Sequence, residues 1–260
     1  MAHRIVAQPL MLSEMLIDEI SFSDALKRAE AEDSKAHGIG TYGEKLLHKT
    51  LKYYFEPDES KHEIESYGSV ADIRNEKEII EIQTRSLSKL VPKLERFLQK
   101  EHVTVVYPLI ENKLICRINT ETGESMPPRK SSKKGRLSTA LAEISMIRQF
   151  VSHERLRVLV VTVDVIETRM MNEKKKIGRK RTAKINTVPT RINQIIELSC
   201  PEDYRQLLPT DLPQSFNATD FQNYTKLNRI ESHGALMLLL QLGILTRSRK
   251  GSDAYIYSIN

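Results

Sequence analysis

The spacing of apolar residues divides the chain into helical and strand-like segments. Apolar residues that recur every three or four positions predict helices, whereas short runs rich in Val and Ile predict strands. Before residue 200, the helical pattern covers one or two short helices within 1–40, a longer helix at 41–55, and helices near 87–100 and 138–152. The strand pattern covers 62–67, 69–74, 78–83, 103–107 and 156–167, with a hairpin at 113–125 that turns at Glu121-Thr122-Gly123.

The order of these segments predicts the topology of a sheet. Residues 41–107 read helix, three strands, helix, strand. A strand reached through a crossover helix returns to the sheet in parallel, whereas strands joined by tight turns are antiparallel. The expected fold class is therefore α/β, or more strictly mixed α+β, with a mixed sheet.

The pattern changes near Pro201. Three helical stretches are followed by two short strands, at 204–208, 218–227, 229–242, 245–249 and 254–259. Helices followed by a terminal hairpin are typical of a small winged helix-turn-helix domain. We expect an N-terminal helical extension (1–40), a main domain with basic loops (41–200) and a winged-helix domain (201–260).

The composition limits the cellular setting. The 260 residues are 40% hydrophobic and 28% charged, and no apolar run approaches the length of a membrane span. Cys116 and Cys200 cannot form a disulfide framework, and acidic residues near the N-terminus interrupt the apolar core that a signal peptide needs. The expectation is a cytoplasmic protein.

The positive charge is concentrated in the middle of the chain. The net charge is +6, but residues 127–184 alone contain 16 Lys or Arg against 5 Asp or Glu. Such a field is typical of a protein that binds a polyanion, and we expect DNA as the partner. The two densest runs contain Arg129, Lys130, Lys133, Lys134, Lys174, Lys175, Lys176, Arg179, Lys180 and Arg181. We expect the second run, residues 172–184, to form a mobile loop. The alternative to DNA binding is that both runs are merely solvated.

The tail offers a second DNA contact. In a DNA-binding winged helix, Arg229 would start the helix that enters a groove, and Arg247, Arg249 and Lys250 would lie on the wing. Residues 209–260, however, carry 5 basic against 4 acidic side chains. The alternative is a winged helix used for dimerisation or partner docking, which would make the protein a homodimer or part of a complex.

Two carboxylates and an amide are spaced to form a metal site. Side chains alternate across a strand, so Glu81 and Gln83 share one face, and Asp72 can converge with them from a neighbouring strand. Two carboxylates, waters and phosphate oxygens are the usual ligands of Mg²⁺. A metal there could generate a nucleophilic water and offset charge on a phosphate, so Mg²⁺ or Mn²⁺ is the expected cofactor.

At these residues the sequence resembles the PD-(D/E)xK nuclease superfamily, the fold of many restriction endonucleases and of archaeal Holliday junction resolvases. The matching motif is Glu44 on the first helix, Asp72 on a central strand and Glu81-Ile82-Gln83 on the next strand. Residues 40–98 are similar in particular to an uncharacterised bacterial branch whose members end in a winged helix. The resemblance implies a restriction-endonuclease-like αβββαβ core. It also implies that Glu44, Asp72, Glu81 and Gln83 are catalytic, and that Asp72 and Glu81 bind the metal.

The sequence departs from the family at one position, because the usual third catalytic residue is lysine and here it is Gln83. An amide can orient a water but contributes no positive charge to the transition state. Lys89 and Lys93, on the following helix, are candidates for a displaced cation.

Each motif residue also has a structural interpretation. Glu44 fits a capping box in which it bonds back to the amide of Thr41. Asp72 could be a solvated residue near a turn, and Glu81 could face water on an edge strand. A buried Glu81 must instead be paired or metal-bound. His48, one turn beyond Glu44, is expected on the helix surface, and the alternative is that it approaches the site.

The sequence thus predicts a Mg²⁺-dependent DNA endonuclease that hydrolyses phosphodiester bonds, in repair, recombination or defence against foreign DNA. One alternative is a catalytically weak or inactive DNA-binding protein of the same fold. The other is a winged-helix transcriptional regulator that carries a structural α/β domain.

Overall fold

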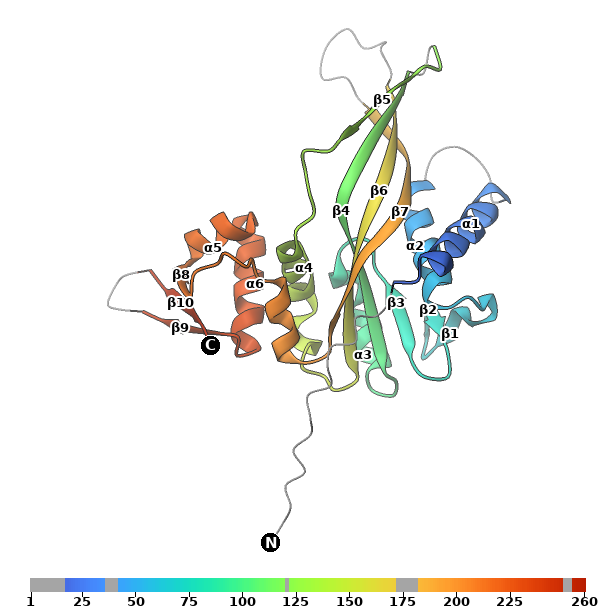
Figure 1. Cartoon of the computed structure of the whole chain (residues 1–260). Helices are drawn as coiled ribbons and strands as arrows, with labels where there is room; N and C mark the ends of the chain where they lie inside the picture. The colour runs from blue at the N-terminus through green and yellow to red at the C-terminus, as the bar shows by residue number, and fades with distance from the viewer. Residues whose placement is uncertain (1–16, 36–41, 120–121, 172–181, 250–253) are drawn as a thin grey trace.

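A computed structural model describes residues 17–35, 42–119, 122–171, 182–249 and 254–260, without the side chains of 33–35, 42–45 and 182–185. It is a mixed α+β structure built on a curled mixed sheet (Figure 1). Among the described residues, no helix is both long enough and apolar enough to cross a membrane.

The large sheet has the mixed topology that the sequence predicted. Its strands are β1 (His62–Ser66), β2 (Ser69–Arg74), β3 (Ile79–Ile82), β4 (Val103–Asn119), β5 (Ser125–Lys130), β6 (Leu156–Met171) and β7 (Thr182–Leu198). The order is β1-β2-β3-β4-β6-β7, and β5 pairs with β4. The β3–β4 and β4–β6 pairs are parallel, and the other pairs are antiparallel. The crossover from β3 to β4 passes through α3 (Val91–Phe97).

Helices cover both faces of this sheet (Figure 1). On one face, α1 (Glu19–Lys35) and α2 (Tyr42–Phe55) pack through Phe22, Leu47 and Leu51 against strand residues that include Ile73 and Ile80. On the other face lie α3 and α4 (Leu137–Ile144). The 3₁₀ segment Ser145–Phe150 continues α4, where the sequence predicted one helix to residue 152.

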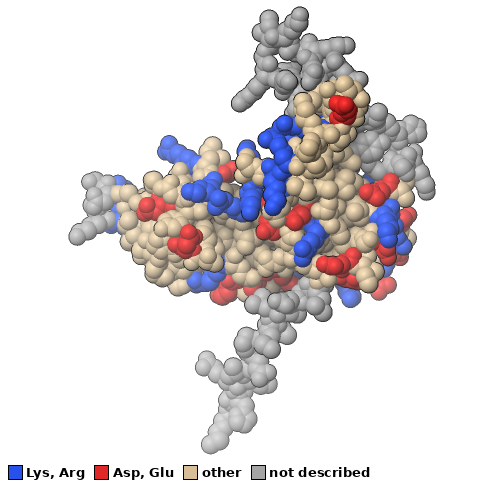
Figure 2. All heavy atoms as spheres, turned by 45° about the horizontal axis from the view of Figure 1, so that its top comes forward, with Lys and Arg blue, Asp and Glu red and all other residues tan. Residues whose placement is uncertain are grey.

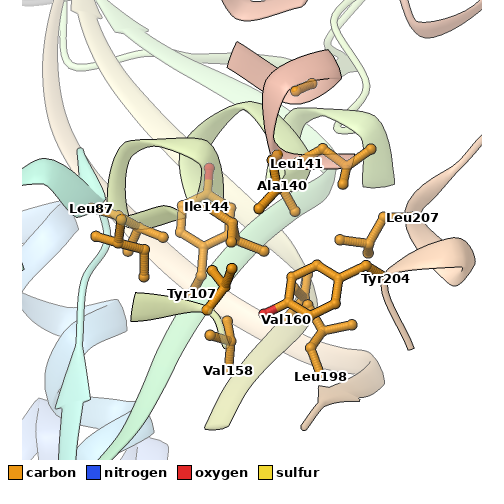
Figure 3. Close-up of a cluster of buried hydrophobic side chains, with 14 of the residues drawn as sticks. Leu87, Tyr107, Ala140, Leu141, Ile144, Val158, Val160, Leu198, Tyr204 and Leu207 are labelled. Atoms are coloured by element: carbon orange, nitrogen blue, oxygen red, sulfur yellow. The ribbon is translucent and has the colours of Figure 1, made fainter. Parts of the chain in front are cut away.

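The core between α4 and the sheet also reaches the C-terminal elements. Figure 3 shows Leu141 and Ile144 of α4 near Val158 and Val160 of β6, with Tyr204 alongside. Tyr204 belongs to the 3₁₀ helix Pro201–Leu207, which occupies the position of the expected short helix at 204–208. One buried cluster therefore runs from the sheet into the tail.

Strands β4, β6 and β7 are 17, 16 and 17 residues long and extend beyond the helices (Figure 1). We call the projecting part, residues 110–119, 122–131, 163–171 and 182–191, the arm. The prediction that the first of these strands ends at residue 107 was wrong, because Pro108 and the polar residues after it do not end the ladder. The strand β7 was not predicted, and the second basic run, expected to be a loop to residue 184, enters β7 at Thr182.

The C-terminal elements form a compact unit with a separate hydrogen-bonded sheet. They are β8 (Ser215–Asn217), α5 (Ala218–Thr225), α6 (Arg229–Gln241), β9 (Leu245–Ser248) and β10 (Ile256–Ile259). The strand order is β8-β10-β9, and β8 was not predicted. The unit docks on α4 and the segment after it, where the hydroxyl of Ser138 donates to the carbonyl of Thr225 (2.9 Å). At Gly234 of α6, a Cβ atom would lie 2.4 Å from Ser145 Oγ, so this close approach requires glycine.

Candidate functional site

Asp72 and Glu81 face each other across neighbouring strands. The antiparallel register of β2 and β3 pairs Ile73 with Ile80, and Asp72 and Glu81 are the next residues beyond this pair. The backbone amide of Asp72 donates to Glu81 Oε1 at 3.4 Å. The two acidic residues that the sequence selected are therefore brought close together.

Glu81 is buried, with 1% of its surface exposed. Its Oε2 accepts a hydrogen bond from Lys93 Nζ of α3 at 2.7 Å. Burial and the charge of Asp72 raise the pKa of Glu81 to about 7, and Lys93 opposes this shift. Ordinary solvation of Glu81 on an edge strand is excluded, because β3 lies between β2 and β4.

Asp72 is held from two sides. Its Oδ2 lies 3.2 Å from His48 Nε2 of α2 and accepts the amide of Ile82 at 2.8 Å. Burial acts to raise the pKa of Asp72, but the contacts with His48 and Ile82 and the charge of Lys93 outweigh it, so the net shift is downward. Asp72 thus stays ionised beside Glu81. His48 was expected on the helix surface, but it is half-buried and contacts the site.

The remaining motif residues are Gln83 and Glu44. Gln83 follows β3, and its backbone N–H donates to the carbonyl of Val106 in β4 (3.0 Å). The side-chain oxygen of Gln83 accepts the amide of Arg85 at 3.3 Å. Glu44 lies in α2, but its side chain is outside the described part of the structure, as is Thr41.

Of the two lysines considered as a displaced cation, the structure brings Lys93 to the site. Lys89 is exposed in the 3₁₀ segment Leu87–Leu90. The sequence could not choose between them, because the choice depends on how α3 is rotated against β3. The Lys93 side chain lies on the side of α3 that faces Glu81.

The donor set suits a hard divalent cation. Two carboxylates converge, and the buried Glu81 lies beside the negative charge of Asp72, which a cation would offset. Mg²⁺ needs only one or two protein carboxylates because it keeps several waters. In the described part of the chain, no group of three or more His, Cys, Asp or Glu side chains forms a complete metal cage. Asp72 and Glu81 are the residues that could hold Mg²⁺, with the remaining ligands supplied by water or substrate.

Part of the predicted basic surface lies beside the base of the arm. Arg129 and Lys130 are exposed on β5, and Lys133 and Lys134 are exposed in the segment before α4. Figure 2 shows Lys and Arg side chains gathered between the arm and the C-terminal unit. The predicted residues Lys174, Lys175, Lys176, Arg179, Lys180 and Arg181 lie outside the described residues.

The predicted residues of the tail that the structure describes, Arg229, Arg247 and Arg249, are exposed. Arg229 is exposed at the start of α6, whose cap Asn228 accepts the amides of Ile230 and Glu231. On the hairpin, the guanidinium groups of Arg247 and Arg249 lie 4.3 and 5.2 Å from the ring centre of Tyr255. Lys250 lies outside the described residues.

Comparison with known proteins places the chain in a family. A family model described as a domain of unknown function (DUF8091) matches residues 45–199, from α2 to the end of the large sheet. The chain belongs to this DUF8091 family. A protein of Treponema pallidum (strain Nichols), described as an uncharacterized protein, is 30% identical over 226 residues, which are 84% of this chain and 86% of that protein. No solved structure matches the chain.

Proposed function

We propose that this protein is a Mg²⁺-dependent DNA endonuclease with a PD-(D/E)xK-like core. The observation that carries the proposal is the pair Asp72 and Glu81, which face each other on β2 and β3 with Lys93 bound to Glu81. The succession α2, β1, β2, β3, α3, β4, with β3 and β4 parallel, supports the same reading. The helices and hairpin after residue 201 support a winged helix.

The chemistry assigns a role to each side chain. Bound Mg²⁺ would supply an acidified water and offset the negative charge that develops on the phosphate. Asp72 and Glu81 would hold the ion, and Gln83 would orient the attacking water. Glu44 would assist from α2. Hydrolysis forms a P–O bond from the water oxygen to phosphorus and breaks one P–O ester bond. The water loses a proton to solvent, and the leaving alkoxide takes a proton from solvent to become an alcohol.

Lys93 resolves the departure at position 83. An amide there cannot supply the positive charge that most of the superfamily takes from lysine, whereas Lys93 Nζ is 2.7 Å from Glu81. In this proposal the cation has moved from the strand to the following helix. Its ammonium group stabilises the transition state electrostatically.

The test is cleavage of plasmid and linear DNA with Mg²⁺, with Mn²⁺ and with a chelator. Glu81→Ala should abolish cleavage, because it removes a metal ligand. Lys93→Met should lower the rate by about 10²- to 10³-fold, the usual cost of one lost electrostatic contact in a preorganised site. Glu95→Ala, an exposed acid on the same helix, is the control and should leave the rate unchanged. Equal cleavage by wild type and Glu81→Ala would reject the assignment.

A second candidate is a DNA-binding protein that has lost efficient cleavage. The observation that favours it is that Lys93 already pairs with Glu81 and that the ring of His48 contacts Asp72, so the ammonium group of Lys93 offsets part of the negative charge inside the protein. Tight, salt-sensitive binding without cleavage in any metal would favour this candidate. The third candidate, a winged-helix transcriptional regulator, has less support. Gly234 and the apolar residues after it bury one face of α6 against the body of the protein, so this face is not free to enter a DNA groove.

A further inference from the structure

One face of the arm carries cationic side chains around a buried carboxylate. Glu167 of β6 is 2% exposed and accepts hydrogen bonds from Lys113 Nζ (2.9 Å) and from the Arg169 guanidinium (2.5 Å). Arg117 of β4 lies opposite Arg169 in the parallel register. Burial acts to raise the pKa of Glu167, but the bonds from Lys113 and Arg169 outweigh it, so the net shift is downward. Two cations therefore contact one ionised carboxylate, and a third, Arg117, lies on the same face of the arm.

Two buried polar atoms on this face have no hydrogen-bond partner. They are Nε of Arg117 and Oγ1 of Thr187. Thr187 is 2% exposed and lies opposite Glu167 in the β6–β7 register, so it points to the same face. A buried group without a partner costs about 1 to 3 kcal/mol. Two such groups beside an excess of positive charge indicate an anionic ligand.

Neighbouring residues extend the positive surface to the edge of the arm. Arg129 of β5 pairs with Ile115, which in turn lies opposite Glu167, so Arg129 belongs to the same row across the arm. At the base of the arm, a pocket of about 300 Å³ is lined by Lys113, Lys130 and Lys134, among other residues. A structural ion network would need only the contacts of Glu167 with its two partners, and it would leave Arg117 and Thr187 unexplained.

We propose that this arm site, formed by Lys113, Arg117, Arg169 and Thr187, binds a backbone phosphate of duplex DNA. The proposal rests on the proposed function in taking DNA as the ligand. It adds a second anchor, remote from Asp72 and Glu81, that nothing in the nuclease motif requires.

The length of β4 sets the size of the substrate. Glu81 pairs with Val105, and Lys113 and Arg117 lie 8 and 12 residues further along the same strand. At about 3.3 Å per residue, the arm site is at most about 26 to 40 Å from the carboxylates along β4. Because duplex DNA rises about 3.4 Å per base pair, a duplex of about 8 to 12 base pairs is long enough to reach both sites. The protein should therefore distinguish long duplexes from short ones.

The experiment compares binding of labelled DNA hairpins with stems of 6 and 20 base pairs, in chelator, over a range of salt. With the long stem, Arg117→Gln should weaken binding roughly tenfold, as expected for a charge-assisted bond, and lower the salt slope by about 0.9. With the short stem, Arg117→Gln and wild type should bind equally. The control is Arg205→Gln, an exposed arginine that follows β7 at the end opposite to the arm.

A second variant protects the test against misfolding. Arg129→Gln replaces an exposed residue on an edge strand, so it should fold normally and show a smaller loss with the same dependence on stem length. The arm proposal is overturned if either variant weakens binding equally for both stems, or if the salt slope does not change. If wild type binds neither stem, both DNA proposals fail. If the length-dependent loss is found but no metal supports cleavage, the arm site stands and the nuclease does not.

Discussion

At the scale of single residues, Glu81 combines burial with a neighbouring negative charge. A bound cation would offset the unfavourable free energy that both impose on the ionised carboxylate. We expect Mg²⁺ to raise the Tm of wild type, because a ligand at one hundred times its Kd stabilises the folded state by about 2.7 kcal/mol. Glu81→Gln should remove this gain. Without metal, its Tm should equal or exceed that of wild type, since the amide no longer opposes Asp72.

Thermal unfolding with and without Mg²⁺ measures this effect. Glu95→Gln on α3 should keep the full gain, because its side chain is exposed and no hydrogen bond in the described structure joins it to the site. A Mg²⁺ gain that survives Glu81→Gln would place the ion elsewhere on the protein.

Position 83 tests how the site replaces the usual lysine. Gln83→Ala should slow cleavage by less than Glu81→Ala does, because the metal ligands remain. Under the proposed function, Gln83→Lys introduces the residue that is usual in the PD-(D/E)xK superfamily and should retain or raise the rate. Initial rates on one DNA substrate at saturating Mg²⁺ measure both changes. If wild type is inert while Gln83→Lys cleaves, the natural protein is a nuclease fold adapted to binding.

The site was partly predictable at this scale. The short turn between β2 and β3 is a local feature, and it correctly predicted that Asp72 and Glu81 lie close together on neighbouring strands. His48 and Lys93 reach the same place from α2 and α3. Their approach depends on how each helix is rotated against the sheet, and apolar spacing alone does not determine that rotation for a charged side chain.

At the scale of elements, the prediction succeeded where each strand is short and bounded by turns. The strands β1, β2 and β3 were placed within one or two residues of their observed ends. The arm was not foreseen, because β7 contains Pro189 and its pairing with β6 shifts register at three places. Those irregularities break the alternation from which a strand is recognised.

The sharp turn after β7 depends on one carboxylate. Asp203 Oδ2 accepts the amides of Ser199 and Cys200 at 2.8 and 2.9 Å. Burial acts to raise the pKa of Asp203, but these amides outweigh it, so its net shift is downward. Asp203→Ala should cost about 1 kcal/mol of stability at pH 7, as expected for a lost cap.

The stabilisation that Asp203 contributes should depend on pH. Because the folded state lowers the pKa of Asp203, its contribution is complete above the ordinary value of 3.8 and is lost as the pH falls through the lower folded value. Urea unfolding at pH 7 and near pH 3 should show a difference between wild type and Asp203→Ala that shrinks in acid. A constant difference would mean that packing, and not the charge, is responsible.

At the scale of the whole molecule, the large sheet and the C-terminal unit share one buried cluster. Leu141 and Ile144 of α4 belong to it together with Leu236 and Leu239 of α6. Sequence patterns identified both parts, but not the surface through which they meet. That surface depends on glycine and serine at positions that carry no apolar signal.

Gly234 tests whether this contact couples the two parts. A Cβ atom there would lie 2.4 Å from Ser145 Oγ, and a valine adds two further methyl groups. Overpacking of this kind costs about 1 to 3 kcal/mol. We expect wild type to unfold in one cooperative transition, and Gly234→Val to lower the midpoint of that same transition.

The matched control is His233→Val, which places the same β-branched residue at an exposed position of the same helix and should have a much smaller effect. Calorimetry together with urea unfolding followed by circular dichroism measures both. Two separate transitions in wild type would show that the units are stable independently, and Gly234→Val should then leave the transition of the large sheet unchanged.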